Sequence, residues 1–476
     1  MKKPSVFHTR RFKSGGYAVL VSVIVTLVVV AVNVFASQLP TTATKFDTTA
    51  QQLYTFSEQT NELVSGLTQD VKLYLIAQSG GEDATTVETL NRYKALSDRI
   101  TVQTVDPVVS PKFTASYTSA TVEDGSVIVV SDLRSKVVSY SDIYQYDYSS
   151  YYYNGSYDVS FAGESELTSA IDYVTSDDLP VLYQLQGHGE TALSGDLLTA
   201  VQKDNLTVQE LSLLSMEAVP DDADCLLIYA PTADLGSEEA AKVISYLEKG
   251  GRLLLITDYS DTEMPNLLSV MNSYGVTTSG GVVVEGDMNR CLRGYTHYLL
   301  PTIDAHDITS PLAESNLYVL MPIAHGITQL DSYRSTLSIS SLLTTSASSY
   351  SKFNAYQATS LNKASGDTDG PFDLGVAISE TVESGETRVV WFSTSQFLTD
   401  DVNQMVGGAN QDLFLNSLGW MCERENSISI RAKSLSQDYL TVPSGDATLW
   451  SALIAVVLPL AVLAIGIVVC VRRRKQ

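Results

Sequence analysis

The sequence is poor in the residues on which metal and redox centres depend. Its 476 residues include four cysteines and five histidines. No CxxC pair and no Cys/His spacing typical of a metal site occurs, so we expect neither a redox centre nor a bound metal. Cys470 lies beside the last basic residues, and the odd number of remaining cysteines argues against a disulfide framework.

Motifs for nucleotide hydrolysis and for serine hydrolases are also missing. The sequence contains no GxxxxGK[ST] phosphate loop, so the chain is not itself a P-loop ATPase. It contains no GxSxG elbow, on which a hydrolase would hold a nucleophilic serine. We therefore predict no cofactor and no catalytic residue.

Basic residues are scarce outside the two ends of the chain. Nine of the 30 Lys and Arg residues lie in the terminal tails, which leaves 21 of them against 54 Asp and Glu residues in between. Such an acidic surface repels nucleic acid and anionic lipid. The composition therefore excludes nucleic-acid binding, and it favours ordinary solvation over a specific cationic ligand.

Two long uncharged runs lie near the ends of the chain, at residues 17–36 and 449–471. At about 1.5 Å rise per residue in a helix, each can cross a hydrocarbon core of roughly 30 Å. Basic tails flank them at residues 1–16 and 472–476, and cationic flanks stay in the cytoplasm. The pattern predicts a two-span protein of the cytoplasmic membrane, with both termini inside and residues 37–448 outside.

The first run also ends like a signal peptide, at Val34-Phe35-Ala36. Its apolar stretch is longer than a signal-peptide core of about 7–15 residues. We therefore expect a retained anchor, with cleavage as the alternative.

Residues 37–159 alternate between apolar runs of strand length and helical patterns. The expected helices are 58–67, with Ser57 as its N-cap, and 84–98. The expected strands are 71–76, 100–107, 126–131 and 136–141, and the last two are expected to form a hairpin. This order predicts a small α/β domain of thioredoxin-like layout without redox cysteines. Eight tyrosines in residues 140–157 predict a surface insertion, with stacking on sugars as the alternative.

Residues 160–435 show a stronger alternation of apolar strands and helices. The expected strands are 179–186, 207–213, 224–231, 252–258 and 388–398, and the later helices are 237–249, 264–274 and 410–423. Continuous apolar strands between helices are typical of a parallel, doubly wound sheet covered on both faces. Residues 281–400 are richer in strands, and residues 436–448 form a linker to the second uncharged run.

Short motifs along the chain resemble one known family. They are Asp47 with Tyr54-Thr55-Phe56-Ser57 and Thr60, Val105-Asp106-Pro107, Gly163-Glu164, Gly187-His188-Gly189-Glu190, and Asn410-Gln411-Asp412 with Asn416-Ser417-Leu418-Gly419-Trp420. In this order they resemble GldG-like proteins, the gliding-motility-type auxiliary components of ABC transport systems. The resemblance implies an accessory membrane subunit beside a permease and a cytoplasmic ATPase. It also implies that residues 160–435 form an auxiliary domain similar to a class I glutamine amidotransferase.

Open α/β sheets bind ligands at the carboxyl ends of their strands. Gly187-His188-Gly189-Glu190 and Asp258 follow two expected strands. Glycines permit a tight turn, the following helix could hold an anion at its N-terminus, and His188 and Glu190 could act as acid and base. Contact with a ligand or partner and a purely structural turn both fit, and contact is the prediction that we carry forward.

These observations predict a non-enzymatic accessory subunit of an ABC-type transport or envelope system, whose domain outside the membrane recognises a substrate or partners. Where an amidotransferase-like hydrolase needs a nucleophile, the sequence reads Asp258-Tyr259-Ser260. A membrane-tethered hydrolase using His188 and Glu190 is one alternative. An envelope adhesion or sugar-binding protein that uses the clustered tyrosines is another.

Overall fold

The structure is a computed structural model, and it describes residues 51–147, 157–422 and 430–435, with residues 17, 20–31, 47, 49, 459 and 472. The chain divides into two compact units, residues 1–145 with 161–433, and residues 146–160 with 434–476. A small three-stranded sheet has the order β22-β6-β5 and is formed by β5 (Tyr144–Asp147), β6 (Asp158–Phe161) and β22 (Lys433–Ser434).

The two uncharged runs at 17–36 and 449–471 lie largely outside the described residues. Of the first run, residues 20–31 are helical, and their apolar side chains are exposed. No helix in the described part of the chain combines the length and the apolar character needed to cross a membrane. Residues 148–156 of the tyrosine-rich segment and the linker at 436–448 also lie outside the described residues.

The first unit opens with a four-stranded sheet of order β2-β1-β3-β4. Strands β1 and β2 are parallel, whereas β3 is antiparallel to both β1 and β4. This part of the chain contains α3 (Glu58–Ser65), β1 (Val71–Ile76), α4 (Ala84–Leu96), β2 (Ile100–Val105), η2 (Thr114–Ser116), β3 (Val127–Val130), β4 (Ser135–Val138), α5 (Tyr140–Ile143) and α7 (Gly163–Thr175). The predicted hairpin at 126–141 is confirmed, and Ser57 caps α3 by accepting from the Thr60 amide, as its position before the helix predicts.

A larger, 12-stranded sheet follows, and one half of it is parallel. Its strands β8, β7, β9, β10 and β21 lie side by side in that order and all run the same way. The elements of this half are β7 (Val181–Leu185), α8 (Gly195–Lys203), β8 (Thr207–Leu211), β9 (Cys225–Tyr229), α9 (Ser237–Leu247), β10 (Arg252–Ile256), α10 (Pro265–Ser273) and β21 (Gly385–Phe392). Each expected strand of the alternating pattern therefore has a counterpart in the sheet.

The other half of the large sheet is antiparallel and extends from β20 towards β19. Its strands are β11 (Val276–Val284), β14 (Thr302–Ile303), β16 (His325–Gln329), β17 (Leu337–Thr344), β18 (Tyr350–Lys352), β19 (Thr368–Asp369) and β20 (Asp373–Val382). A separate three-stranded sheet is formed by β12 (Cys291–Leu292), β13 (Tyr295–Leu299) and β15 (Met321–Pro322). The remaining elements are α11 (Ser310–Glu314), η3 (Ala355–Gln357), η4 (Gln396–Leu398), α12 (Asp400–Met405) and α13 (Ala409–Met421).

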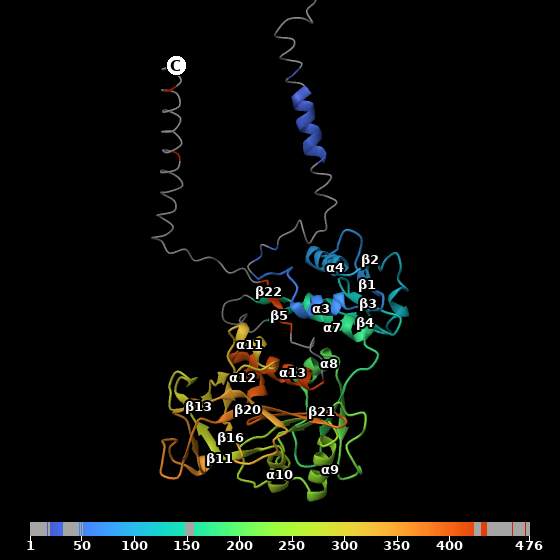
Figure 1. Ribbon diagram of the computed structural model, residues 1–476. Helices are drawn as coiled ribbons and strands as arrows, with labels where there is room; N and C mark the ends of the chain where they lie inside the picture. Colours follow the sequence, from blue (N-terminus) through green and yellow to red (C-terminus); the bar gives the residue numbers. More distant parts are fainter. Residues whose placement is uncertain are drawn as a thin grey trace, which may run out of the picture. The chain divides into compact units, whose positions relative to one another are not determined.

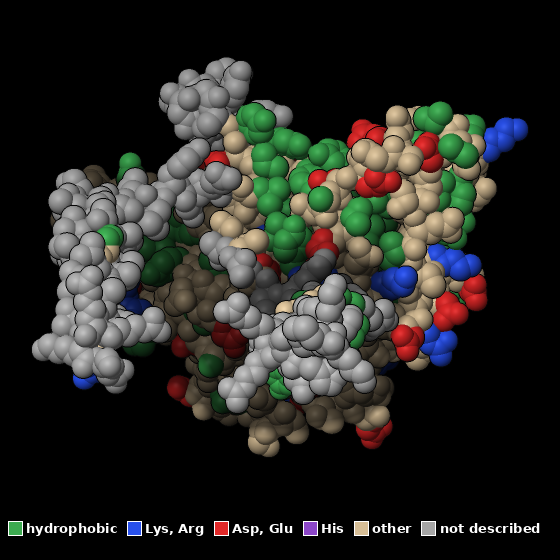
Figure 2. Space-filling model, turned by 90° about the horizontal axis from the view of Figure 1, so that it is seen from above, with side chains coloured by type: hydrophobic (Ala, Val, Ile, Leu, Met, Phe, Trp, Pro, Cys, Tyr) green, Lys and Arg blue, Asp and Glu red, His purple; other side chains and the backbone are tan. Residues whose placement is uncertain are grey.

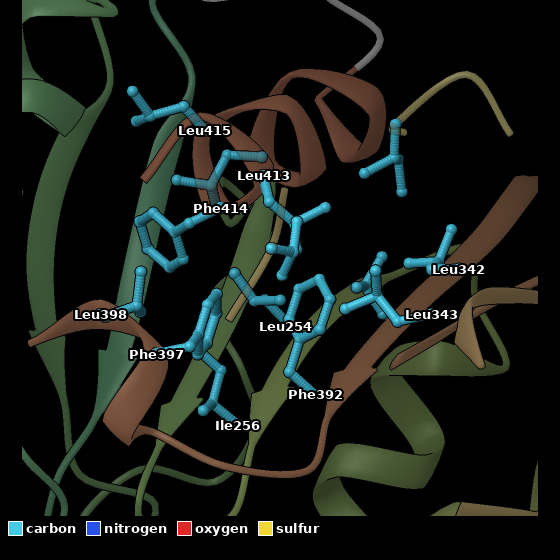
Figure 3. Packing of buried hydrophobic residues seen from close by; sticks show 14 of the residues in the cluster. Leu254, Ile256, Leu342, Leu343, Phe392, Phe397, Leu398, Leu413, Phe414 and Leu415 are labelled. Atoms are coloured by element: carbon cyan, nitrogen blue, oxygen red, sulfur yellow. The ribbon is translucent and has the colours of Figure 1, made fainter. Parts of the chain in front are cut away.

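The large sheet is buried on both faces, because alternate residues of its central strands enter two different cores. Leu254 and Ile256 of β10 join a core that includes Phe414 of α13 (Figure 3). Leu253 and Leu255 join the core under α9 and α10 on the opposite face (Figure 1). A strand buried on both faces has no polar side, which explains why these strands are continuous apolar runs in the sequence.

The described residues therefore form a mixed α/β structure with several sheets, as the sequence predicts.

The charged side chains do not separate by sign on the face shown in Figure 2. Acidic and basic groups of described residues lie interspersed there, and hydrophobic side chains gather over one region.

Candidate functional site

The Gly187–Glu190 loop leaves the carboxyl end of β7 in a tight turn that needs its two glycines. Gly187 and Gly189 have φ values of 127° and 76°, in the region that residues with a Cβ rarely adopt. A Cβ on Gly189 would also collide with the Thr232 hydroxyl oxygen. Both glycines expose their backbone, whereas the side chains of His188 and Glu190 are 7% and 1% exposed.

His188 is held by carboxylates on both ring nitrogens. Its Nδ1 lies 3.1 Å from Glu190 Oε1, and its Nε2 lies 2.9 Å from Glu239 Oε2. A carboxylate oxygen accepts hydrogen bonds, so a ring nitrogen of His188 that carries a proton can donate to the carboxylate that it faces. The arrangement places a buried imidazole between two buried carboxyl groups.

This cluster connects the loop after β7 with the loop and helix after β9. The His188 carbonyl accepts hydrogen bonds from the amides of Thr232 and Ala233 at 3.0 and 2.9 Å. Glu239 lies in the first turn of α9, and its Oε2 also accepts from the Gly236 amide at 2.8 Å. The second oxygen of Glu239 is buried and has no hydrogen-bond partner among the described residues. Among the described residues, the hydrogen-bond partners of the Glu239 carboxyl group are thus the His188 ring and the Gly236 amide, both at Oε2.

The position of the cluster follows from the strand order. Numbered along the chain, the parallel half β8-β7-β9-β10-β21 has the order 2-1-3-4-5, whose switch point lies between β7 and β9. In doubly wound sheets the crevice at that point is the usual ligand site. Here the loops on the two sides of the switch point both contact His188, so the protein's own side chain links them.

Asp258 does not join this cluster, although it follows the neighbouring strand β10. Its two oxygens accept hydrogen bonds from the amide and the hydroxyl of Ser395, at 2.6 and 2.7 Å. Ser395 follows β21, so Asp258 connects the carboxyl ends of β10 and β21. The structure thus brings Gly187 to Glu190 together with Glu239, and it gives Asp258 a different partner.

A buried histidine at the same end of the sheet was not singled out by the sequence. His325 begins β16 and is 4% exposed, and burial lowers its pKa to about 4. Its Nδ1 lies 3.2 Å from both the Gly326 carbonyl oxygen and the Thr278 hydroxyl oxygen. Its Nε2 lies 2.8 Å from the Thr257 hydroxyl oxygen, which accepts a hydrogen bond from the Trp391 indole. Spacing in the sequence gives no indication of this chain of contacts.

Two cavities lie elsewhere. One of about 1150 Å³ is lined by residues of α7, α8 and the α12–α13 turn, and one of about 360 Å³ lies near Ser57 and Lys433. None of the five predicted site residues lines either cavity. Within the described ranges, no group of three or more His, Cys, Asp or Glu side chains is placed to hold a metal ion.

Three other residues of the family-like motifs, Asp47, Asp106 and Asn410, form hydrogen bonds with the backbone. The Asp47 carboxylate accepts from the Tyr54 amide at 2.7 Å, and the Asp106 carboxylate accepts from the amides of Ser79 and Val108. The fully buried Asn410 amide donates to the carbonyls of Leu320 and Phe397. The side chains of these motif residues therefore hold the backbone in place, a role that the motifs in the sequence do not reveal.

Comparison with known families decides the assignment. A family model described as "ABC-type uncharacterized transport system" matches residues 179–417, which is half of the chain. The chain belongs to this family. The match begins just before β7 and ends inside α13, so it includes the whole Gly187–Glu190 loop and both halves of the large sheet. A second model, a domain of unknown function (DUF7088), matches residues 50–144. Membership associates this chain with an ABC transport system, in an accessory role.

No curated protein matches this chain. Among solved structures, the chain is similar to the structure titled "mmIFT52 N-terminal domain", with 11% identity, a TM-score of 0.38, and coverage of 51% of this chain and 97% of that one. It is also similar to PurLQS from Thermotoga maritima, with 11% identity, a TM-score of 0.26, and coverage of 51% and 100%. A third similar structure is the exo-beta-1,4-mannosidase Op5Man5 from Opitutaceae bacterium strain TAV5, with 11% identity, a TM-score of 0.26, and coverage of 53% and 39%. Likenesses this low do not bear on the function of this family member.

Proposed function

We propose that this chain is a non-enzymatic accessory subunit of an ABC-type transport system that assembles with a permease and a cytoplasmic ATPase. The family match over residues 179–417 is the observation that carries the proposal. Because the sequence has no phosphate loop, energy for transport has to come from a partner. The domain outside the membrane would recognise the substrate or other subunits, as the resemblance to GldG-like proteins implies.

The geometry of His188 supports a non-enzymatic role over the hydrolase alternative. A general base needs a ring nitrogen within reach of the proton that it removes. Both ring nitrogens of His188 already face carboxylates, and its side chain is 7% exposed. Asp258, at the elbow position, is bound to Ser395 rather than to His188.

The proposed membrane topology rests on the sequence. Residues 17–36 and 449–471 would span the membrane, the tails at 1–16 and 472–476 would be cytoplasmic, and residues 37–448 would be outside. A cysteine introduced at the exposed Ser365 should then react with an impermeant maleimide in intact cells, whereas one at Lys3 should not. Labelling at Lys3 but not at Ser365 would refute this orientation.

The proposed domains are a thioredoxin-like one at 37–159 and an amidotransferase-like one at 160–435, followed by the linker at 436–448. The first is supported by the sheet order β2-β1-β3-β4, in which parallel β1 and β2 flank α4 and the β3–β4 hairpin pairs with β1. A doubly wound parallel half-sheet supports the second. The separate family matches at 50–144 and 179–417 fit this division.

We further propose that the Gly187–Glu190 loop, with Asp258 beside it at the same edge of the sheet, forms the contact with a ligand or partner subunit. The backbone of Gly187 and Gly189 is exposed there. Leu214 is 70% exposed and lies beside Gly187. A Cβ added to Gly187 would lie 3.4 Å from the Leu214 Cδ1 atom. An exposed leucine next to an exposed backbone turn is a surface that a partner can cover.

The test is recovery of the permease and ATPase with the tagged full chain in mild detergent. Replacing His188 and Glu190 together by Gln changes the loop and should reduce recovery. The matched control is Glu239→Gln, which disturbs the same buried cluster from α9 and leaves every loop residue in place. Equal losses in both variants would mean that the loop is structural, and unchanged recovery in both would refute the contact.

A further inference from the structure

Glu164, the second residue of α7, is a buried carboxylate whose partners come from opposite ends of the folded part of the chain. Its residue is 4% exposed. From the N-terminal side, the Ser57 amide and the Thr60 hydroxyl donate to Oε1 at 2.6 and 3.0 Å. From the C-terminal side, the Lys433 ammonium donates to Oε2 at 2.7 Å.

Lys433 also binds the N-terminal segment directly. Its Nζ donates to the Thr55 carbonyl at 2.6 Å, so one ammonium group contacts both Glu164 and the segment before α3. Its side chain is 18% exposed, and that of Glu164 is 6% exposed. A charge-assisted hydrogen bond is roughly twice as strong as a neutral one, and removing one partner of a buried pair leaves the other charge without compensation.

The position of Glu164 in α7 is itself fixed by a buried polar network. The Tyr93 hydroxyl of α4 donates to the Glu164 carbonyl at 3.0 Å and lies 2.6 Å from the Thr168 hydroxyl. The Thr168 hydroxyl lies 2.9 Å from that of Thr60 in α3. Three helices thus hold one carboxylate at the point where the chain enters and leaves this unit.

We propose that Glu164 and Lys433 form a latch that ties residues 51–60 to residues 430–433, so that a displacement of either segment is passed to the other through α7. This inference goes beyond the accessory role. Only its consequence, the coupling of two membrane-spanning ends, rests on the proposed topology. The latch itself rests on the contacts of Glu164 and is tested without any partner subunit.

The test is hydrogen–deuterium exchange of the full chain in mild detergent. Lys433→Met keeps the length of the side chain and removes its charge, and it should speed exchange roughly tenfold or more in residues 51–61 as well as in 430–435. The matched control is Arg431→Met. Arg431 pairs with Asp412 of α13, and its loss should affect 430–435 while residues 51–61 keep the wild-type rate. Lys433→Arg should retain protection in both segments.

Coupling between two sites is reciprocal, which supplies a second arm. Thr60→Val removes a hydroxyl that binds Glu164 without changing the size of the side chain, and it should speed exchange in residues 430–435. This arm decides the matter if Lys433→Met unfolds the whole domain. Unchanged exchange at 51–61 in a folded Lys433→Met protein would overturn the latch, as would equal acceleration there in Arg431→Met. Unchanged exchange at 430–435 in Thr60→Val would overturn it as well.

Discussion

Removing the imidazole of His188 should cost a large part of the stability of this domain. The variant His188→Ala leaves the carboxyl groups of Glu190 and Glu239 buried, with side chains 1% and 5% exposed, and takes away the ring that contacts both of them. Removing the partner of a buried carboxylate costs about 3–5 kcal/mol, because the carboxylate is left in the interior without compensation. Typical domains have only about 5–15 kcal/mol of total stability, so the effect should be plain.

Urea unfolding of residues 40–445, expressed alone, measures this cost. Adding Glu239→Gln to His188→Ala removes one of the carboxyl groups left without its partner, so the double variant should be more stable than the sum of the two single losses by about 1–3 kcal/mol. A loss below about 1 kcal/mol in His188→Ala, the range of an exposed pair, would refute the reasoning. Strict additivity of the two substitutions would refute it too, since it would mean that His188 and Glu239 do not interact.

Three further predictions concern the same domain. Residues 40–445 should fold alone into a soluble protein with a cooperative melt, because both faces of the large sheet are already covered by its own helices, and aggregation without a melt would contradict this. The free energy of unfolding should fall as pH drops from about 6.5 towards 4, by up to about 1.4 kcal/mol per pH unit. The reason is that His325 has a pKa of about 4 in the folded protein, so the unfolded chain takes up a proton on this residue first. In urea unfolding curves measured over this pH range, His325→Gln should remove most of the fall. Asn410→Ala should cost at least about 3 kcal/mol in the same assay, since it leaves the backbone groups of Leu320 and Phe397 buried without partners, whereas a loss near zero would show that water replaces the amide.

Local patterns were sufficient for the elements and for the class of the fold. The strand predicted at 71–76 is β1 with the same bounds, and the helix predicted at 237–249 is α9 at Ser237–Leu247. Both depend on the period of apolar residues, which the chain carries locally. The individual strands of the antiparallel half were not predicted from the sequence. Short strands such as β14 and β19 are defined by their pairing rather than by their own composition.

The candidate site shows where local reasoning ends. The turn at Gly187–Glu190 was predictable, because two glycines around a histidine after an apolar strand mark a strand end. The role of Glu239, which contacts His188, was not predictable. Nothing in the α9 sequence distinguishes it from an ordinary acidic residue in a first helical turn. The partner of Asp258 was equally out of reach, because Ser395 lies 137 residues away.

By itself, then, the sequence determined the charge, the uncharged runs, the alternation of strands and helices, and the family resemblance, because these are properties of composition and of neighbouring residues. Only the tertiary structure decided which polar groups meet. It joined His188 to Glu239 across the switch point of the sheet, and it joined Ser57, Glu164 and Lys433 in one buried contact. Burial makes such charged groups pair, and the fold alone selects the partner from distant parts of the chain.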